Sequence, residues 1–63
     1  MSLAAWFRGA SITEADIRLE IWRLGARHRG WPLEGAQEEL AEKGVPDDRA
    51  ALLRACVKKL QRQ

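Results

Sequence analysis

The side chains best suited to chemistry in this 63-residue sequence are its single histidine, His28, and its single cysteine, Cys56. A nucleophilic side chain needs a base within hydrogen-bond reach, and no Ser, Asp or Cys is spaced beside His28 to form a convincing pair. A structural zinc site normally takes four Cys or His ligands. We therefore expect no enzyme, no metal site and no cofactor.

Both residues fall on apolar helical stripes, and we interpret them as core residues. His28 follows Leu24 by four residues, in the last turn of a predicted helix. An imidazolium there would also suit the negative end of the helix. Cys56 falls between Leu53 and Leu60, as expected for a small buried hydrophobic residue.

Three glutamates, Glu34, Glu38 and Glu42, are spaced four residues apart, with Glu39 beside them. Paired carboxylates can serve as general acid and base or as metal ligands. The spacing puts these carboxylates on one helical stripe, away from the apolar residues of the same helix. This favours a solvated face, and the alternative is an acidic docking surface for a basic partner.

A basic stripe of Arg54, Lys58 and Arg62 is the best candidate for phosphate contacts in the chain. The arginines nearer the N-terminus do not share one side; Glu20 and Arg23, for example, have the i, i+3 spacing of an ion pair. The net charge also alternates, from +2 to −3 to +3 in three consecutive segments. A nucleic-acid binder more often concentrates one sign on one face, so a nucleic-acid-binding regulator is the alternative function.

The elements that must position these side chains are helices. The sequence has no β-branched run, no alternating apolar and polar stretch and no Asn-Gly turn, so strands are not expected. We predict an all-α fold, a small three-helix bundle preceded by a short apolar N-terminal helix, in a single domain. The expected helices span residues 1–9, 12–29, 32–43 and 47–61.

The start of the 12–29 helix has two candidate capping boxes, one formed by Thr13 with Asp16 and a competing one formed by Ser11 with Glu14. Glycine is the usual residue just beyond a helix C-terminus, because it adopts the left-handed conformation at little cost. Gly30 is therefore the expected C′ residue of this helix.

The 32–43 helix is bounded by Pro32, which suits the first helical position, and by Gly44, which suits C′. Gly35 lies inside this helix, where glycine costs about 1 kcal/mol relative to alanine. Asp47 is the expected N-cap of the last helix.

One apolar stripe from each of the three longer helices should form the core. At about 100° per residue, these stripes contain Ile17, Ile21, Leu24 and His28, then Leu33, Ala36 and Leu40, and finally Leu52, Leu53, Cys56, Val57 and Leu60.

The 12–29 helix carries a second apolar stripe on its opposite side. This stripe contains Ala15, Leu19, Trp22 and Ala26, and Arg18 lies on its flank. A helix at the surface of a monomer should not be apolar on two opposite faces. Either the N-terminal helix covers the stripe within one chain, or another chain covers it. The predicted partner-binding residues are Leu3, Trp6, Phe7, Ala15, Arg18, Leu19, Trp22 and Ala26.

The small size of the chain favours a partner. A domain of about 60 residues buries too little surface to be more than marginally stable alone, and one cysteine excludes an internal disulfide. We expect a homo-oligomer, with a dimer favoured. No apolar run approaches the length of a membrane span, no signal peptide is recognisable, and a free thiol fits a reducing compartment. The predicted protein is a cytoplasmic, self-associating adaptor or regulatory subunit.

Overall fold

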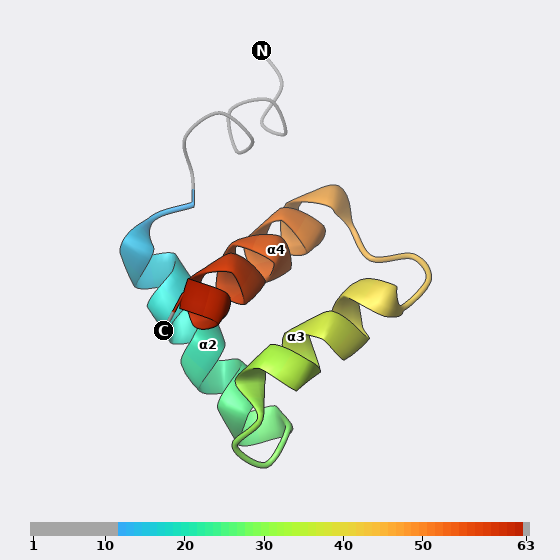
Figure 1. Cartoon of the computed structure of the whole chain (residues 1–63). Helices are drawn as coiled ribbons and strands as arrows, with labels where there is room; N and C mark the ends of the chain where they lie inside the picture. Colours follow the sequence, from blue (N-terminus) through green and yellow to red (C-terminus); the bar gives the residue numbers. More distant parts are fainter. Residues whose placement is uncertain (1–11, 63) are drawn as a thin grey trace.

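A computed structural model describes residues 12–62 and folds them into three helices (Figure 1). These are α2 (Glu14–Arg27), α3 (Pro32–Ala41) and α4 (Asp47–Arg62). The predicted all-α three-helix bundle is confirmed, and residues 12–62 contain no strand. The predicted helix over residues 1–9, with its partner-binding residues Leu3, Trp6 and Phe7, lies outside the described residues.

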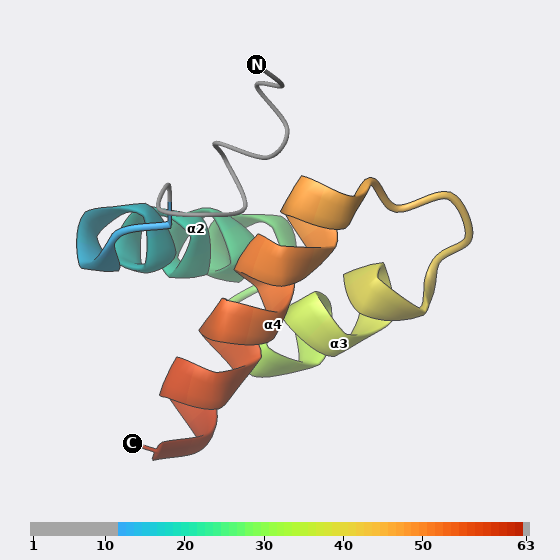
Figure 2. The same cartoon turned by 90° about the horizontal axis from the view of Figure 1, so that it is seen from above.

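Each of the three helices contacts the other two. In the view of Figure 1, α2 and α3 form a V that meets at the turn between them, and α4 crosses in front of α2. Figure 2 shows the same crossing from above. An exposed ion pair between Lys59 of α4 and Glu14 in the first turn of α2 links the two helices. None of the helices in the described range has both the length and the apolar character that a membrane span requires.

The α2 helix begins at the capping box predicted from Thr13 and Asp16. The Asp16 backbone N–H donates to Thr13 Oγ1 at 3.1 Å, and the Thr13 backbone N–H donates to Asp16 Oδ2 at 3.1 Å. These two bonds satisfy backbone donors that the first helical turn leaves without a partner. The start of α2 is thus encoded locally.

The end of α2 differs from the prediction. The helix stops at Arg27 with His28 as C-cap, so Arg29 and not Gly30 occupies C′. The Gly30 N–H donates to the carbonyl of Gly25 at 2.7 Å, as in a Schellman turn. This geometry places Arg29 in the left-handed region with a φ of 57°, which costs a non-glycine residue about 1–2 kcal/mol.

The α3 helix begins with Pro32 at its first position, as predicted, but ends at Ala41, two residues before the predicted boundary at 43. Glu42 is already extended, with a ψ of 148°. Gly44 therefore lies in the α3–α4 loop, where it takes a φ of 81°. Val45 then packs against the core. The α3–α4 loop therefore starts at Glu42, and the left-handed residue Gly44 lies within the loop and not directly after the last helical residue.

The core lies where the three predicted stripes meet. Leu24, Ala36, Leu53 and Cys56 are fully buried. Six partly buried residues pack around them, namely Ile17, Ile21, Leu40, Val45, Leu52 and Val57. Leu33 and Leu60 are half-buried at the ends of their stripes. The bundle thus buries one face of each helix, as the periodicity predicts.

The structure explains why a glycine occupies position 35 inside α3, which the sequence alone did not show. A Cβ atom at this position would lie 2.2 Å from Cδ2 of the His28 ring, far inside van der Waals contact. The imidazole therefore packs directly against the backbone of α3. Glycine allows this close approach, which brings the end of α2 against the first half of α3.

Candidate interaction surface

The outer face of α2 presents the apolar residues that the second stripe contains. The side chain of Trp22 is 71% exposed and that of Leu19 is 48% exposed. Ala15, Ala26 and the flanking Arg18 are exposed on the same side of the helix. All five predicted partner-binding residues within the described range therefore share one surface, which we call the α2 outer face.

The opposite side of α2 anchors it in the bundle. Leu24 is fully buried, and Ile17 and Ile21 pack against the core cluster. The core therefore holds α2 by the side opposite the α2 outer face.

A buried ion-pair network further fixes α2, and its centre is Glu20, which is only 3% exposed. Glu20 Oε2 lies 2.6 Å from a guanidinium nitrogen of Arg49 and 3.0 Å from one of Arg27. The pair expected between Glu20 and Arg23 does not form, because Arg27 and Arg49 take this carboxylate. Burial alone would raise the pKa of Glu20, but hydrogen bonds from Arg49 and Arg27 lower it overall.

A second carboxylate, that of Glu39 on α3, completes the network. It accepts hydrogen bonds from Arg49 at 2.9 Å and Arg27 at 3.1 Å, and it lies 2.8 Å from Nε2 of His28. Burial acts to raise the pKa of Glu39, but the hydrogen bonds from His28, Arg49 and Arg27 outweigh it and hold that pKa at about 2. The network thereby joins all three helices behind the α2 outer face.

The sequence grouped Glu39 with the exposed glutamates, and the structure separates it from them. Glu34, Glu38 and Glu42 are exposed, as a solvated face requires, whereas Glu39 is half-buried. Its position three residues after the buried Ala36 puts it at the edge of the inner face. The spacing from Ala36 could have indicated that Glu39 is partly buried. Its partners Arg27 and Arg49 lie on other helices, so the sequence alone could not identify these pairs.

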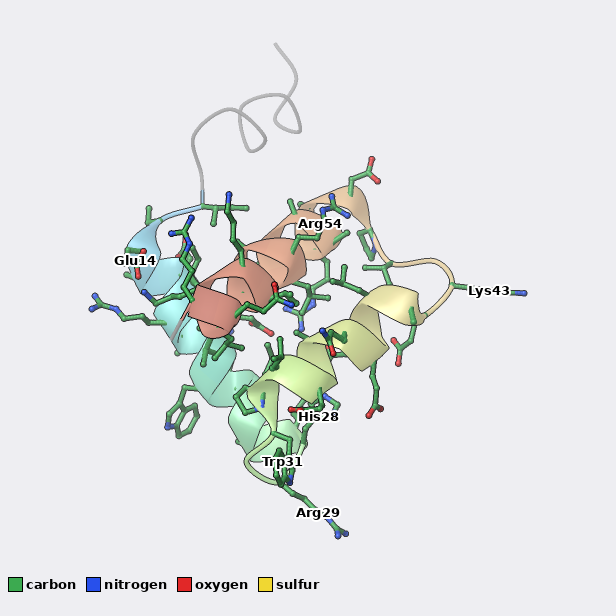
Figure 3. All side chains as sticks on the ribbon, in the orientation of Figure 1. Glu14, His28, Arg29, Trp31, Lys43 and Arg54 are labelled. Carbon is green, nitrogen blue, oxygen red and sulfur yellow. The ribbon has the colours of Figure 1, made fainter. Side chains whose placement is uncertain are left out.

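The predicted basic stripe on α4 is also exposed. Arg54, Lys58 and Arg62 all face solvent, and Figure 3 labels Arg54 on this helix. Within residues 12–62, none of the three forms an ion pair, whereas Arg49 and Lys59 of the same helix both do. The basic residues of α4 thus form two groups. Arg49 and Lys59 pair with carboxylates of other helices, and Arg54, Lys58 and Arg62 form an exposed stripe.

Cys56 lies in the core, as its apolar neighbours indicated. Its thiol is fully buried and lies 3.8 Å from the carbonyl oxygen of Ile17, to which it donates a weak hydrogen bond. Burial first, and the negative charge of Glu20 second, raise the pKa of this thiol to about 11. The thiolate that reacts with electrophiles is therefore scarce near neutral pH.

An open hollow of about 390 Å³ lies beside the α2–α3 turn, where His28, Arg29 and Trp31 line it. Trp31 is 63% exposed, and Figure 3 shows Arg29 and Trp31 at the turn, at the end of the molecule away from Lys43.

No group of three or more His, Cys, Asp or Glu residues in the described part of the chain is arranged to hold a metal ion. Comparison of the chain with protein-family models, curated proteins and solved structures gave no match.

Proposed function

We propose that this protein is a small, non-enzymatic helical module for protein–protein interaction, acting as a self-associating adaptor or regulatory subunit. Its binding surface is the α2 outer face. The observation that supports this proposal is the 71% exposure of Trp22, beside the half-exposed Leu19, on a helix whose other side is already buried in the core.

The composition of this face suits an interface. Burying a large apolar side chain is worth about 1.5–3 kcal/mol, so Trp22 and Leu19 together offer several kcal/mol to a partner. Tryptophan and arginine are enriched among the residues that dominate binding energy, and Arg18 borders the patch. The alanines at positions 15 and 26 leave room for a partner backbone to approach closely.

The bundle behind the face favours binding because it is pre-organised. The core residues and the network around Glu20 and Glu39 hold α2 in place. A surface that needs no ordering loses less conformational entropy on association. A bound partner would in turn stabilise a domain of marginal size. The unpaired Cys56 fits the reducing cytoplasm, where we place the protein.

Site-specific photo-cross-linking tests this proposal. A benzophenone amino acid replaces Trp22 in the full chain, and the same amino acid replaces Trp31 in a matched control, because Trp31 is also largely exposed but lies outside the α2 outer face. The proposal expects protein adducts from position 22 and few from position 31. An absence of adducts from position 22, or equal adducts from both positions, would contradict it.

A second candidate is nucleic-acid binding through Arg54, Lys58 and Arg62. The observation in its favour is that these cations are exposed along one side of α4 and form no ion pair within residues 12–62. Fluorescence anisotropy with duplex and single-stranded nucleic acid tests it. Lys58→Gln should reduce the slope of log affinity against log salt by about 1, whereas Lys43→Gln, in the α3–α4 loop, should not. No binding at low salt would exclude this candidate.

A further inference from the structure

We propose that the partner of the α2 outer face is a second copy of this chain, bound through an antiparallel pairing of the two α2 helices. This inference rests on the proposed function, since it names the occupant of the same surface. Three observations carry it: the spacing of the apolar residues, the charges on the two edges of the face, and the position of the rest of the bundle.

The apolar residues follow the spacing of a coiled-coil seam. Ala15, Leu19, Trp22 and Ala26 are separated by four, three and four residues, as are successive d and a positions of a heptad. In an antiparallel pair about a two-fold axis, Leu19 faces Trp22 of the second copy and Ala15 faces Ala26 of the second copy. Leu19 and Trp22 thus pack beside the two-fold axis, and Ala15 and Ala26 lie at the two ends of the interface.

The charges at the edges of the face select the antiparallel orientation. Asp16 and Arg23 lie along one edge, and Arg18 and Gly25 lie along the other. In the antiparallel pair, Asp16 meets Arg23 of the second copy, and two-fold symmetry repeats this contact. In a parallel pair, Arg18 would meet Arg23 of the second copy, so like charges would oppose each other twice.

Both members of the proposed ion pair are available. Arg23 is exposed and forms no ion pair within the described range, because Glu20 is held by Arg27 and Arg49. Asp16 uses Oδ2 to accept from the Thr13 backbone, and its second carboxylate oxygen can accept from a guanidinium.

The bundle leaves room for this dimer. Because α3 and α4 pack on the inner side of α2, two copies joined through their α2 outer faces keep their remaining helices on opposite outer sides. The resulting interface is isologous: each copy contributes the same surface and the assembly closes at two chains.

A charge-exchange experiment on the full chain tests both the partner and the orientation. Sedimentation velocity is measured over a concentration series for the wild type, for Arg23→Glu, for Asp16→Lys, and for an equimolar mixture of the two variants. The wild type should dimerise. Each variant alone should dimerise roughly tenfold more weakly at low salt, because two attractive pairs become repulsive. The mixture should recover the wild-type affinity as a heterodimer.

Other outcomes overturn the inference. Stronger dimerisation of Arg23→Glu would indicate the parallel orientation, in which the new Glu would meet Arg18. A wild type that stays monomeric excludes the second copy as partner and the self-association in the proposed function, although adducts to another protein from position 22 would still support a protein-interaction role for the α2 outer face. Asp16→Lys removes part of the capping box of α2, so circular dichroism must first show that this variant keeps its helix content. If it does not, the test rests on Arg23→Glu, because Arg23 lies in the middle of the helix.

Discussion

Replacing Glu39 by Gln should remove much of the pH dependence of stability below about pH 5. The pKa of this carboxyl is about 2 in the folded state against 4.5 for the unperturbed group. Each pKa unit corresponds to 1.36 kcal/mol, so the charged carboxylate contributes on the order of 3 kcal/mol to folding. Because the folded pKa is the lower one, this contribution is complete above about pH 4.5 and is lost as the pH falls through about 2.

The assay is urea unfolding followed by far-ultraviolet circular dichroism, at about pH 7 and at successively lower pH. Glu39→Gln should be less stable than the wild type by roughly 2–3 kcal/mol at neutral pH, and the two curves should converge near pH 2. Glu38→Gln is the matched control: it is the neighbouring glutamate on α3 but is exposed, and it should follow the wild type throughout. A constant difference between Glu39→Gln and the wild type at every pH would refute the reasoning.

Three further predictions follow from the backbone and the core. Gly35→Ala should destabilise the fold by about 1–3 kcal/mol, because its Cβ would lie 2.2 Å from the His28 ring. In the control Gly25→Ala, the new Cβ meets nothing within 4 Å and should stabilise α2 by up to about 1 kcal/mol. Equal changes in the free energy of urea unfolding for the two variants would contradict the packing of His28 against Gly35. Arg29→Gly should raise the unfolding free energy by about 0.5–1 kcal/mol, because it relieves a left-handed φ, and a loss of stability would argue against that conformation. Cys56 should react with a thiol reagent only on unfolding, so rapid labelling of the native protein would show that it is accessible.

The parts of the fold that depend on local sequence could be predicted. The 3.6-residue periodicity of apolar residues identified all three described helices and their buried faces, since each helix must bury one stripe. The capping box of Thr13 and Asp16 was recognisable because both partners lie within one turn.

The parts that depend on contacts between helices could not be predicted. Glu20 was expected to pair with Arg23 of its own helix, but it is buried and pairs with Arg49, which reaches it from α4. Gly35 was interpreted as a local weakness, although the ring of His28 requires it. Arg29 occupies the C′ position that was expected for Gly30 and takes a φ of 57°, and Gly30 itself has a φ of 86°.

The α2 outer face was predictable as a set of residues, because it follows from the same periodicity as the core. The structure adds that the bundle anchors the helix from behind and that the network of Glu20 and Glu39 holds it there. These contacts turn an apolar stripe into a fixed surface.

The most direct measurement of the central claim is the concentration dependence of sedimentation for Trp22→Glu, compared with the wild type and with Trp31→Glu. The account predicts that the wild type and Trp31→Glu associate, that Trp22→Glu stays monomeric, and that Trp22→Glu keeps the unfolding free energy of the wild-type monomer. Unchanged association of Trp22→Glu would contradict the claim. A large loss of monomer stability would also contradict it, since Trp22 would then be a core residue of its own chain.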